Sequence, residues 1–192
     1  MITPFNICEG PATVSWAPFG TTEPADADVA ADPGGIWEDV GGTLDGQPVL
    51  FEIDLTYGDL TVDQLVDPVG GRLTKRAIQV TLALEETTLD NMLVATNQLG
   101  NKSVQPGYTT LDPVTTSSAT QPTYTALIID GWAPTLANGN AARRRIIARK
   151  CLTSSKVALE YQKDKPASYA LTWKLYYVSD SIPLYHIVDQ TA

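Results

Sequence analysis

The chain has 192 residues, of which 43% are hydrophobic and 18% are charged, and its formal net charge is −9 at pH 7. This length suits a single domain with its own hydrophobic core, and the apolar content is too high for a disordered protein. The sequence contains no apolar run of about 18 residues, which excludes a membrane-spanning helix and predicts no membrane partner. The acidic balance disfavours binding to the phosphate backbone of nucleic acids.

The charges are distributed unevenly along the chain. Residues 1–71 contain thirteen acids and neither Lys nor Arg, whereas residues 72–192 contain nine acids and thirteen bases. An acidic and a basic surface on one subunit favour head-to-tail association, the geometry that builds rings and filaments. The alternative, that the fold mixes both signs over one surface, stays open on charge alone.

The first segment with a structural signal is residues 1–24, which contain four prolines and one short apolar patch at 12–17. Proline fixes φ and removes a backbone donor, so we predict an extended N-terminal arm with at most one strand. An acidic loop follows at 25–35. The first six residues lack a basic region followed by an apolar run, and no secretory signal is expected.

Alternation of apolar and polar residues begins after an Asp45-Gly46 pair, a strong hairpin signal. The alternation covers 49–56 and then 59–63, which predicts strands there. A longer strand is predicted at 75–84, with its small and polar face toward solvent or a lumen. Its other face is expected in the core: Ile78, Val80, Leu82 and Leu84.

One helix is predicted near residue 89. Thr87 or Thr88 can cap its N-terminus, Asp90 suits the positive end of the helix dipole, and Gly100 is a natural stop. Residues 100–122 are rich in Thr, Ser, Pro and Gly and lack periodicity, so a long loop is predicted there. A loop of that length in a compact domain is usually functional or flexible.

The remaining strands are predicted at 123–133, 143–152, 156–162 and 168–178, followed by a C-terminal tail at 179–192. Lys163–Pro166 is predicted to be a turn that joins the last two strands in a hairpin. Residues 1–192 are therefore interpreted as one domain of mainly β class. We expect a sandwich or barrel of about eight strands with one flanking α-helix and extended arms and loops.

No motif predicts an enzyme, a metal site or a cofactor. His186 is the only histidine, and the only cysteines, Cys8 and Cys151, are expected to be free thiols. One histidine and two cysteines without motif spacing are too few ligands for a zinc cluster. No glycine-rich phosphate loop is present. Glu52 and Asp54 are expected on one strand face, as are Asp59 and Asp63. Such same-face acids more often form an acidic surface than a catalytic pair.

A basic run near residue 145 is the counterpart of these acids. Arg143, Arg145 and Arg149 are expected on one face of their strand, with Arg144 and Lys150 on the other. No aromatic residues are interleaved with them, so we favour pairing with acids of another subunit over nucleic-acid binding. The candidate inter-subunit or lumen charges are Glu52, Asp54, Asp59, Asp63, Arg72, Lys75, Arg76, Arg143, Arg144, Arg145 and Arg149.

Five motifs run through residues 11–97, half of the chain. They are VSWAPFGTTEP at 14–24, WEDVGGT at 37–43, YGDLTVDQLVDPVG at 57–70, RLTKR at 72–76 and ETTLDNML at 86–93. In this order they resemble the major tail proteins, or tail tube proteins, of long non-contractile-tailed bacteriophages, particularly those of actinobacterial hosts. The motifs are structural patterns and carry no catalytic signature.

The resemblance implies a β-sandwich or barrel with a flanking helix, six copies to a ring, and rings stacked into a hollow tail tube. Four strands of each subunit would line the lumen, and the arm 1–24, the loop 100–122 and the tail 179–192 would reach the next ring. An acidic lumen would let DNA slide through without specific binding. The other implied partners are tape measure, terminator and distal tail proteins, in a virion tail assembled in the bacterial host cytoplasm.

Two alternatives remain open at this stage. One is another virion or injection-system protein, such as a tail terminator, a head decoration protein or a contractile-type tube subunit. The other is a monomeric β-sandwich that binds carbohydrate on exposed tryptophans. The four candidates for that second role are Trp16, Trp37, Trp132 and Trp173.

Overall fold

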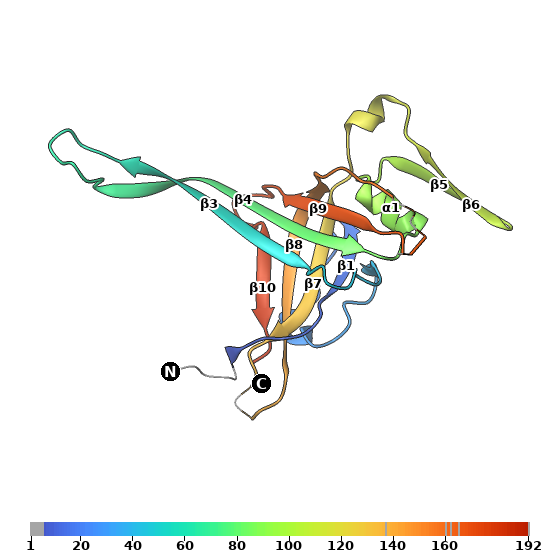
Figure 1. The fold of residues 1–192 in the computed structure, drawn as a ribbon, viewed down its shortest axis with the longest axis horizontal. Coiled ribbons are helices and arrows are strands. Elements are labelled where there is room, and N and C mark those ends of the chain that lie inside the picture. The colour runs from blue at the N-terminus through green and yellow to red at the C-terminus, as the bar shows by residue number, and fades with distance from the viewer. Residues whose placement is uncertain (1–5, 137, 160, 162, 165, 192) are drawn as a thin grey trace.

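A computed structural model describes residues 6–191 apart from Ala137, Glu160, Gln162 and Lys165 (Figure 1). It contains ten strands, one α-helix and two short 3₁₀ helices within those residues. The strands are β1 (Thr13–Pro18), β2 (Glu38–Asp39), β3 (Leu50–Leu60), β4 (Gly70–Leu84), β5 (Gly100–Gln105), β6 (Tyr108–Pro113), β7 (Thr125–Ala133), β8 (Ala142–Thr153), β9 (Tyr169–Leu175) and β10 (Tyr185–Asp189). The helices are α1 (Leu89–Ala95), η2 (Asp26–Asp28) and η3 (Ser117–Thr120). The predicted mainly β class with one flanking helix is confirmed.

The strands form a sheet in the order β2-β1-β7-β8-β9-β4-β3, and β10 also pairs with β8. The first half of β8, Arg144–Ala148, pairs with β10, whereas its end, Cys151–Thr153, pairs with β9. Strand β8 therefore belongs to two layers. In Figure 1 the strands β3, β4 and β9 run across β7, β8 and β10 at a large angle. This is the arrangement of a sandwich whose corner is made by a strand that switches layers.

The main core lies between the two layers. The predicted inner face of β4 is confirmed, because Ile78, Val80, Leu82 and Leu84 are all buried there. Burial of these side chains on one face of an antiparallel layer follows from the two-residue period of the strand. The largest partners from β9 and β7 are Tyr169, Leu171, Trp173 and Leu127.

A second apolar cluster covers the opposite face of β7 and β8. Trp37 packs there on Ala126, Ile128 and Ile147, below the chain between β1 and β2. That chain is the acidic segment at 25–35 with its flanking residues. The acidic loop predicted from sequence therefore closes over a sheet face and does not extend freely into solvent.

The helix begins where the sequence predicts. The side chain of Thr88 accepts a hydrogen bond from the backbone N–H of Asn91, 3.1 Å away, as an N-cap does. The predicted stop at Gly100 is wrong. The helix ends at Ala95, and Asn97 and Gln98 turn the chain with φ near +57°, so Gly100 is already the first residue of β5.

Two segments predicted to be irregular are paired strands. The predicted long loop 100–122 contains the β5–β6 hairpin and η3, because Pro106-Gly107 forms a two-residue turn, with Gly107 at φ +90°. The predicted tail 179–192 contains β10, which pairs along β8. Both pairings depend on contacts that alternation alone does not reveal in strands of five or six residues.

One segment predicted to be a strand is irregular in the structure. Residues 156–159 of the predicted strand 156–162 have no strand pairing, and Glu160 and Gln162 lie outside the described residues. The predicted hairpin with the next strand is therefore wrong, because β9 pairs with β4 and β8 instead. The predicted strand at 12–17 corresponds to β1, which lies between β2 and β7 in the sheet.

Candidate assembly surface

The hairpin of β3 and β4 extends far beyond the body of the protein (Figure 1). The two strands pair from Leu50–Thr81 out to Leu60–Gly70, but β9 supports β4 only from Gln79 to Leu84. The six residue steps from Asp54 to Leu60 alone add about 20 Å at about 3.4 Å per step. From here on, the arm means residues 53–78 and not the N-terminal segment 1–24. A two-stranded hairpin is marginally stable by itself in water, so such an arm needs a partner.

The arm has one apolar and one polar face. Phe51 packs at the edge of the core, and the same strand face continues outward as Ile53, Leu55 and Tyr57. Tyr57 is directly paired with Leu73 and Ile53 with Ile78, which extends this apolar face onto β4, although Leu55 is paired with the basic Arg76. Ile53, Leu55, Tyr57 and Leu73 are all exposed. The face that builds the core therefore continues into solvent, and its side chains stay exposed among the residues that the structure describes.

The opposite face of the arm is polar. Gln79 donates a hydrogen bond from Nε2 to the Glu52 carboxylate at 2.7 Å, and Asp54 is paired with Ala77 on the same face. Lys75, paired with Thr56, follows further out. Two of the predicted acids thus share a face, as expected. A hairpin with one apolar and one polar face is typical of a sheet that is covered on one side only.

The two other predicted acids do not form a pair on a strand. Asp59 lies two residues beyond Tyr57 on β3, on the face opposite to Glu52, and Asp63 lies in the turn at the end of the arm. The strand predicted at 59–63 ends at Leu60 because the chain turns there, with the Val69 N–H bonded to the Leu60 carbonyl at 2.8 Å. A shared face for Asp59 and Asp63 is therefore wrong.

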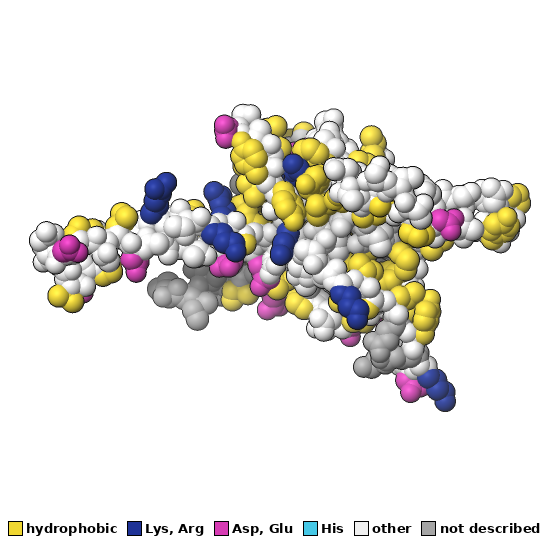
Figure 2. Space-filling model, turned by 90° about the horizontal axis from the view of Figure 1, so that it is seen from above, with side chains coloured by type: hydrophobic (Ala, Val, Ile, Leu, Met, Phe, Trp, Pro, Cys, Tyr) yellow, Lys and Arg dark blue, Asp and Glu magenta, His cyan; other side chains and the backbone are white. Residues whose placement is uncertain are grey.

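Each long edge of the arm has its own charge. The outer edge of β3 carries no paired strand, and Gly70–Ile78 of β4 have none on the side away from β3. Strand β3 bears only acids and β4 only bases. Figure 2 shows the basic side chains along one edge of the arm and acidic ones along the other. Among the described residues, no ion pair joins the two sets, Glu52, Asp54 and Asp59 against Arg72, Lys75 and Arg76.

The arginines of β8 find partners within the subunit. Arg145 is buried and binds Asp130 through both carboxylate oxygens, at 2.7 and 2.8 Å. Arg144 binds Asp189 of β10 in the same way, at 2.6 and 2.7 Å. These hydrogen bonds raise the pKa of Arg144 and lower the pKa of Asp189. Arg143 stacks on the Trp132 ring, with its guanidinium carbon 3.9 Å from the ring centroid.

Arg149 is also paired within the chain, but at the edge of a cavity. Its guanidinium donates to both carboxylate oxygens of Glu23, at 2.5 and 2.9 Å, and to the carbonyl of Pro183. The hydrogen bonds to Glu23 raise the pKa of Arg149. This pair joins the acidic first third of the chain to its basic part. The opposite charges that the sequence separates therefore meet inside one subunit at this point.

A bulge in β8 corrects the predicted orientation of Lys150. Ala148 pairs with Leu127 and Cys151 with Thr125, so Arg149 and Lys150 together oppose Ala126. The Lys150 ammonium lies 4.5 Å from the Tyr124 ring centroid and 5.5 Å from that of Phe19. Sequence alternation predicts that Arg149 and Lys150 point to opposite faces. With the bulge, Arg149 lines the cavity and Lys150 lies beside Phe19, one of the residues of its wall.

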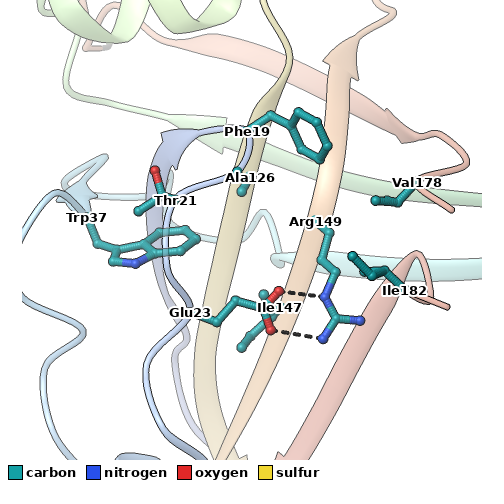
Figure 3. A pocket seen from close by; sticks show the side chains of 10 residues that line it. Phe19, Thr21, Glu23, Trp37, Ala126, Ile147, Arg149, Val178 and Ile182 are labelled. Carbon is teal, nitrogen blue, oxygen red and sulfur yellow. Dashed lines mark hydrogen bonds and ion pairs between the residues drawn. The ribbon is translucent and has the colours of Figure 1, made fainter.

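This cavity, the β7–β8 pocket, has a volume of about 320 Å³ and an open mouth. Phe19, Trp37, Ile147, Val178 and Ile182 supply its apolar wall, and Figure 3 shows the Glu23–Arg149 pair at its lower side. Its polar groups are already bonded within the chain. The Trp37 Nε1 donates to the Thr22 carbonyl and the Thr21 hydroxyl to that of Pro18. The pocket therefore offers an apolar surface to an occupant.

The tryptophans considered for carbohydrate binding do not form an exposed platform. Trp173 and Trp37 are buried, Trp132 is covered by Arg143, and Trp16 is partly buried against the core. Stacking of a sugar requires an accessible ring face. The geometry of the described residues therefore gives the carbohydrate-binding alternative no support.

The remaining candidate groups for chemistry are isolated. His186 lies at the surface, with its Nε2 3.1 Å from an Asp26 carboxylate oxygen. Cys8 is exposed, and Cys151 is buried, which raises the pKa of its thiol. The described residues contain no group of three or more side chains that could bind a metal ion. No helix in the described part of the chain is long and apolar enough to cross a membrane.

Comparison with known proteins does not identify a family. No protein-family model matches the chain, and no curated protein matches it. A solved structure titled "Crystal structure of Hcp protein" aligns with 95% of this chain and 100% of that chain, at 11% sequence identity and a TM-score of 0.35. Membership of the phage tail tube family stays a prediction from sequence.

Proposed function

We propose that this protein is a structural subunit whose copies join through the arm into rings that stack as a hollow tube. The observation that carries this proposal is the uncovered apolar face formed by Ile53, Leu55, Tyr57 and Leu73. A face of this kind on a thin projecting hairpin marks an interaction surface, because water is a poor partner for it. Packing it on another subunit would extend the core from one copy to the next.

The charges of the arm favour a head-to-tail arrangement. An edge that bears only acids and an edge that bears only bases are complementary between two copies oriented alike. Both edges also expose backbone N–H and C=O groups that another strand can satisfy. Repetition of one such contact builds a closed ring if the rotation closes, and the polar arm face with Glu52, Asp54 and Lys75 would then line its interior.

The finer form of the proposal follows the sequence resemblance. It assigns the protein to the tail tube of a long non-contractile-tailed phage, in the virion tail, with six copies to a ring and passage of DNA through the lumen. Tape measure, terminator and distal tail proteins are the further partners of such a tube. No chemical step is part of this role.

Negative-stain microscopy and light scattering of the purified chain test the proposal. We expect rings or hollow tubes of uniform width, and a strictly monomeric sample over a wide concentration range would overturn it. A Leu55→Asp/Tyr57→Asp variant is expected to remain folded but monomeric, because it places two charges on the apolar face. Ile36→Asp is the control, since Ile36 is also an exposed aliphatic residue but lies outside the arm; this variant should assemble normally.

A further inference from the structure

The end of the arm is an apolar, acidic turn on which no other part of the described chain packs. Val62, Leu65, Val66 and Val69 are exposed there, and Val66 is fully so. Backbone hydrogen bonds from Leu65 to Val62 and from Val69 to Leu60 hold the turn in shape. We call residues 61–69 the tip. Exposed aliphatic side chains on an ordered turn can insert into an apolar cavity of another molecule.

The charge of the tip is purely negative. Asp63 and Asp67 lie within it, Asp59 lies just before it, and no Lys or Arg occurs before Arg72. A surface that receives the tip must therefore combine an apolar recess with a cation that has no carboxylate partner of its own. Both properties follow from the hydrophobic effect and from electrostatic complementarity across interfaces.

The β7–β8 pocket has both properties. Its wall is apolar, its polar groups are bonded within the chain, and about 320 Å³ accommodates two or three aliphatic side chains. Lys150 lies beside its Phe19 wall, and no carboxylate of the described residues forms an ion pair with it. Arg149 is less suited than Lys150 to bind Asp63 or Asp67. Its guanidinium already donates hydrogen bonds to Glu23 and to the Pro183 carbonyl.

We infer that the tip of one subunit inserts into the β7–β8 pocket of a second copy, with Leu65 and Val66 in the recess and Asp63 or Asp67 beside Lys150. The inference rests on the self-association proposed above and names the receiving surface for it. The tip cannot fold back onto its own pocket as the structure stands, because the arm holds it away from the body (Figure 1).

A disulfide between copies tests this contact directly. Ile182 lines the mouth of the pocket and is exposed. In a Cys8→Ser background, Val66→Cys and Ile182→Cys together should form covalent dimers and longer ladders under mild oxidation, because a disulfide requires Cβ atoms about 4 Å apart. Each single substitution should give no ladder. Val104→Cys with Ile182→Cys is the matched control, since Val104 is also an exposed valine, near the turn of the β5–β6 hairpin.

Assembly is measured first by light scattering on the same reduced samples, which separates the two proposals. Assembly without Val66–Ile182 ladders, or ladders formed by Val104 instead, overturns the docking contact and leaves the self-association intact. Absence of assembly in the Cys8→Ser parent and in the unmodified chain overturns both.

A charge exchange tests the same contact in a second way. Lys150→Glu should reduce assembly at least several-fold, and adding Asp63→Lys and Asp67→Lys to the same chain should restore it. Failure of that restoration in a variant with unchanged melting contradicts the pairing.

Discussion

Arg145 and Asp130 face each other directly across the β7–β8 ladder and form a bidentate ion pair in which the arginine is 2% exposed. The same guanidinium donates to the backbone carbonyls of Asp28 and Ala31, at 3.3 and 2.6 Å. One side chain therefore fixes the acidic loop onto the outer face of the sheet. The basic run that the sequence assigns to subunit contacts is, at this position, part of the folded subunit.

Removal of this arginine should destabilise the fold. Arg145→Ala leaves the Asp130 carboxylate and two carbonyls without their donor, and loss of one partner of a buried pair costs about 3–5 kcal/mol. Chemical denaturation measures this loss, and hydrogen exchange should show its first opening in residues 26–39. Arg143→Ala, which removes a stacked but less buried side chain, is the control and should cost much less. An equal cost for both would contradict the assigned role of the Asp130 pair.

The two left-handed residues after α1 should respond in opposite ways to glycine. Asn97 accepts from the Thr153 N–H at 2.6 Å and donates to its carbonyl at 3.2 Å, whereas the Gln98 Nε2 is buried without a partner. Gln98→Gly removes the strain of a positive φ and a buried donor without a partner. It should therefore raise the free energy of unfolding by roughly 1 kcal/mol. Asn97→Gly relieves the same φ but loses both bonds, so it should destabilise. Thermal melting of both variants checks this, and stabilisation by both would contradict it.

The Arg144–Asp189 pair should make the docking of β10 sensitive to acid. The pKa of Asp189 is lowered in the folded protein, so its contribution is complete above the unfolded pKa of about 4 and is lost as pH falls through the folded value. Both side chains are more than a third exposed, which limits the contribution to below about 1 kcal/mol.

Unfolding free energies of the wild type and Asp189→Asn measure this effect. The difference should be present at pH 7 and should shrink steadily below about pH 4. Asp112→Asn removes an exposed carboxylate of β6 and serves as the control. A difference for Asp189→Asn that stays constant from pH 7 to pH 2 would show that the ion pair is not its source.

The two thiols should differ strongly in reactivity. Cys8 is exposed, whereas Cys151 is buried in the core and its pKa is raised by burial, so it holds little of the reactive thiolate. An aromatic disulfide reagent should label one thiol rapidly in the native protein and two after denaturation. In Cys8→Ser the rapid phase should disappear. Rapid labelling of that variant under native conditions would indicate that the core opens at Cys151.

Charge reversal on the arm should separate assembly from folding. Asp54→Lys and Lys75→Glu, two changes on the polar face of the arm, should each weaken assembly, because they place like charges across the proposed contact between the two arm edges. The double variant should recover part of it, and melting should be nearly unchanged in all three, since these side chains are exposed and form no ion pair within the described subunit. Additive loss in the double variant would argue against the edge contact. Reversal of Arg145 is unsuitable for this test, because it would unfold the loop at 26–31.

The sequence alone determines the elements whose own side chains carry the signal. Two-residue alternation placed the buried face of β4, and Thr88 placed the start of α1, because burial pattern and capping are local properties. Strands β7 and β8 were also predicted nearly in full. The projecting apolar arm begins in that same alternation, but the sequence did not reveal that its outer half leaves the body.

Only the tertiary structure decided which segments meet. The strands of the β5–β6 hairpin are short and polar and β10 has only five residues, so these strands are stabilised by a partner rather than by propensity. The partners of Arg145 and Arg149 lie 15 and 126 residues away in sequence, and charge counting could not distinguish pairing within a subunit from pairing between subunits. A single bulge opposite Ala126 places Lys150 beside the Phe19 wall of the pocket, since one extra residue reverses the alternation that sequence reasoning relies on.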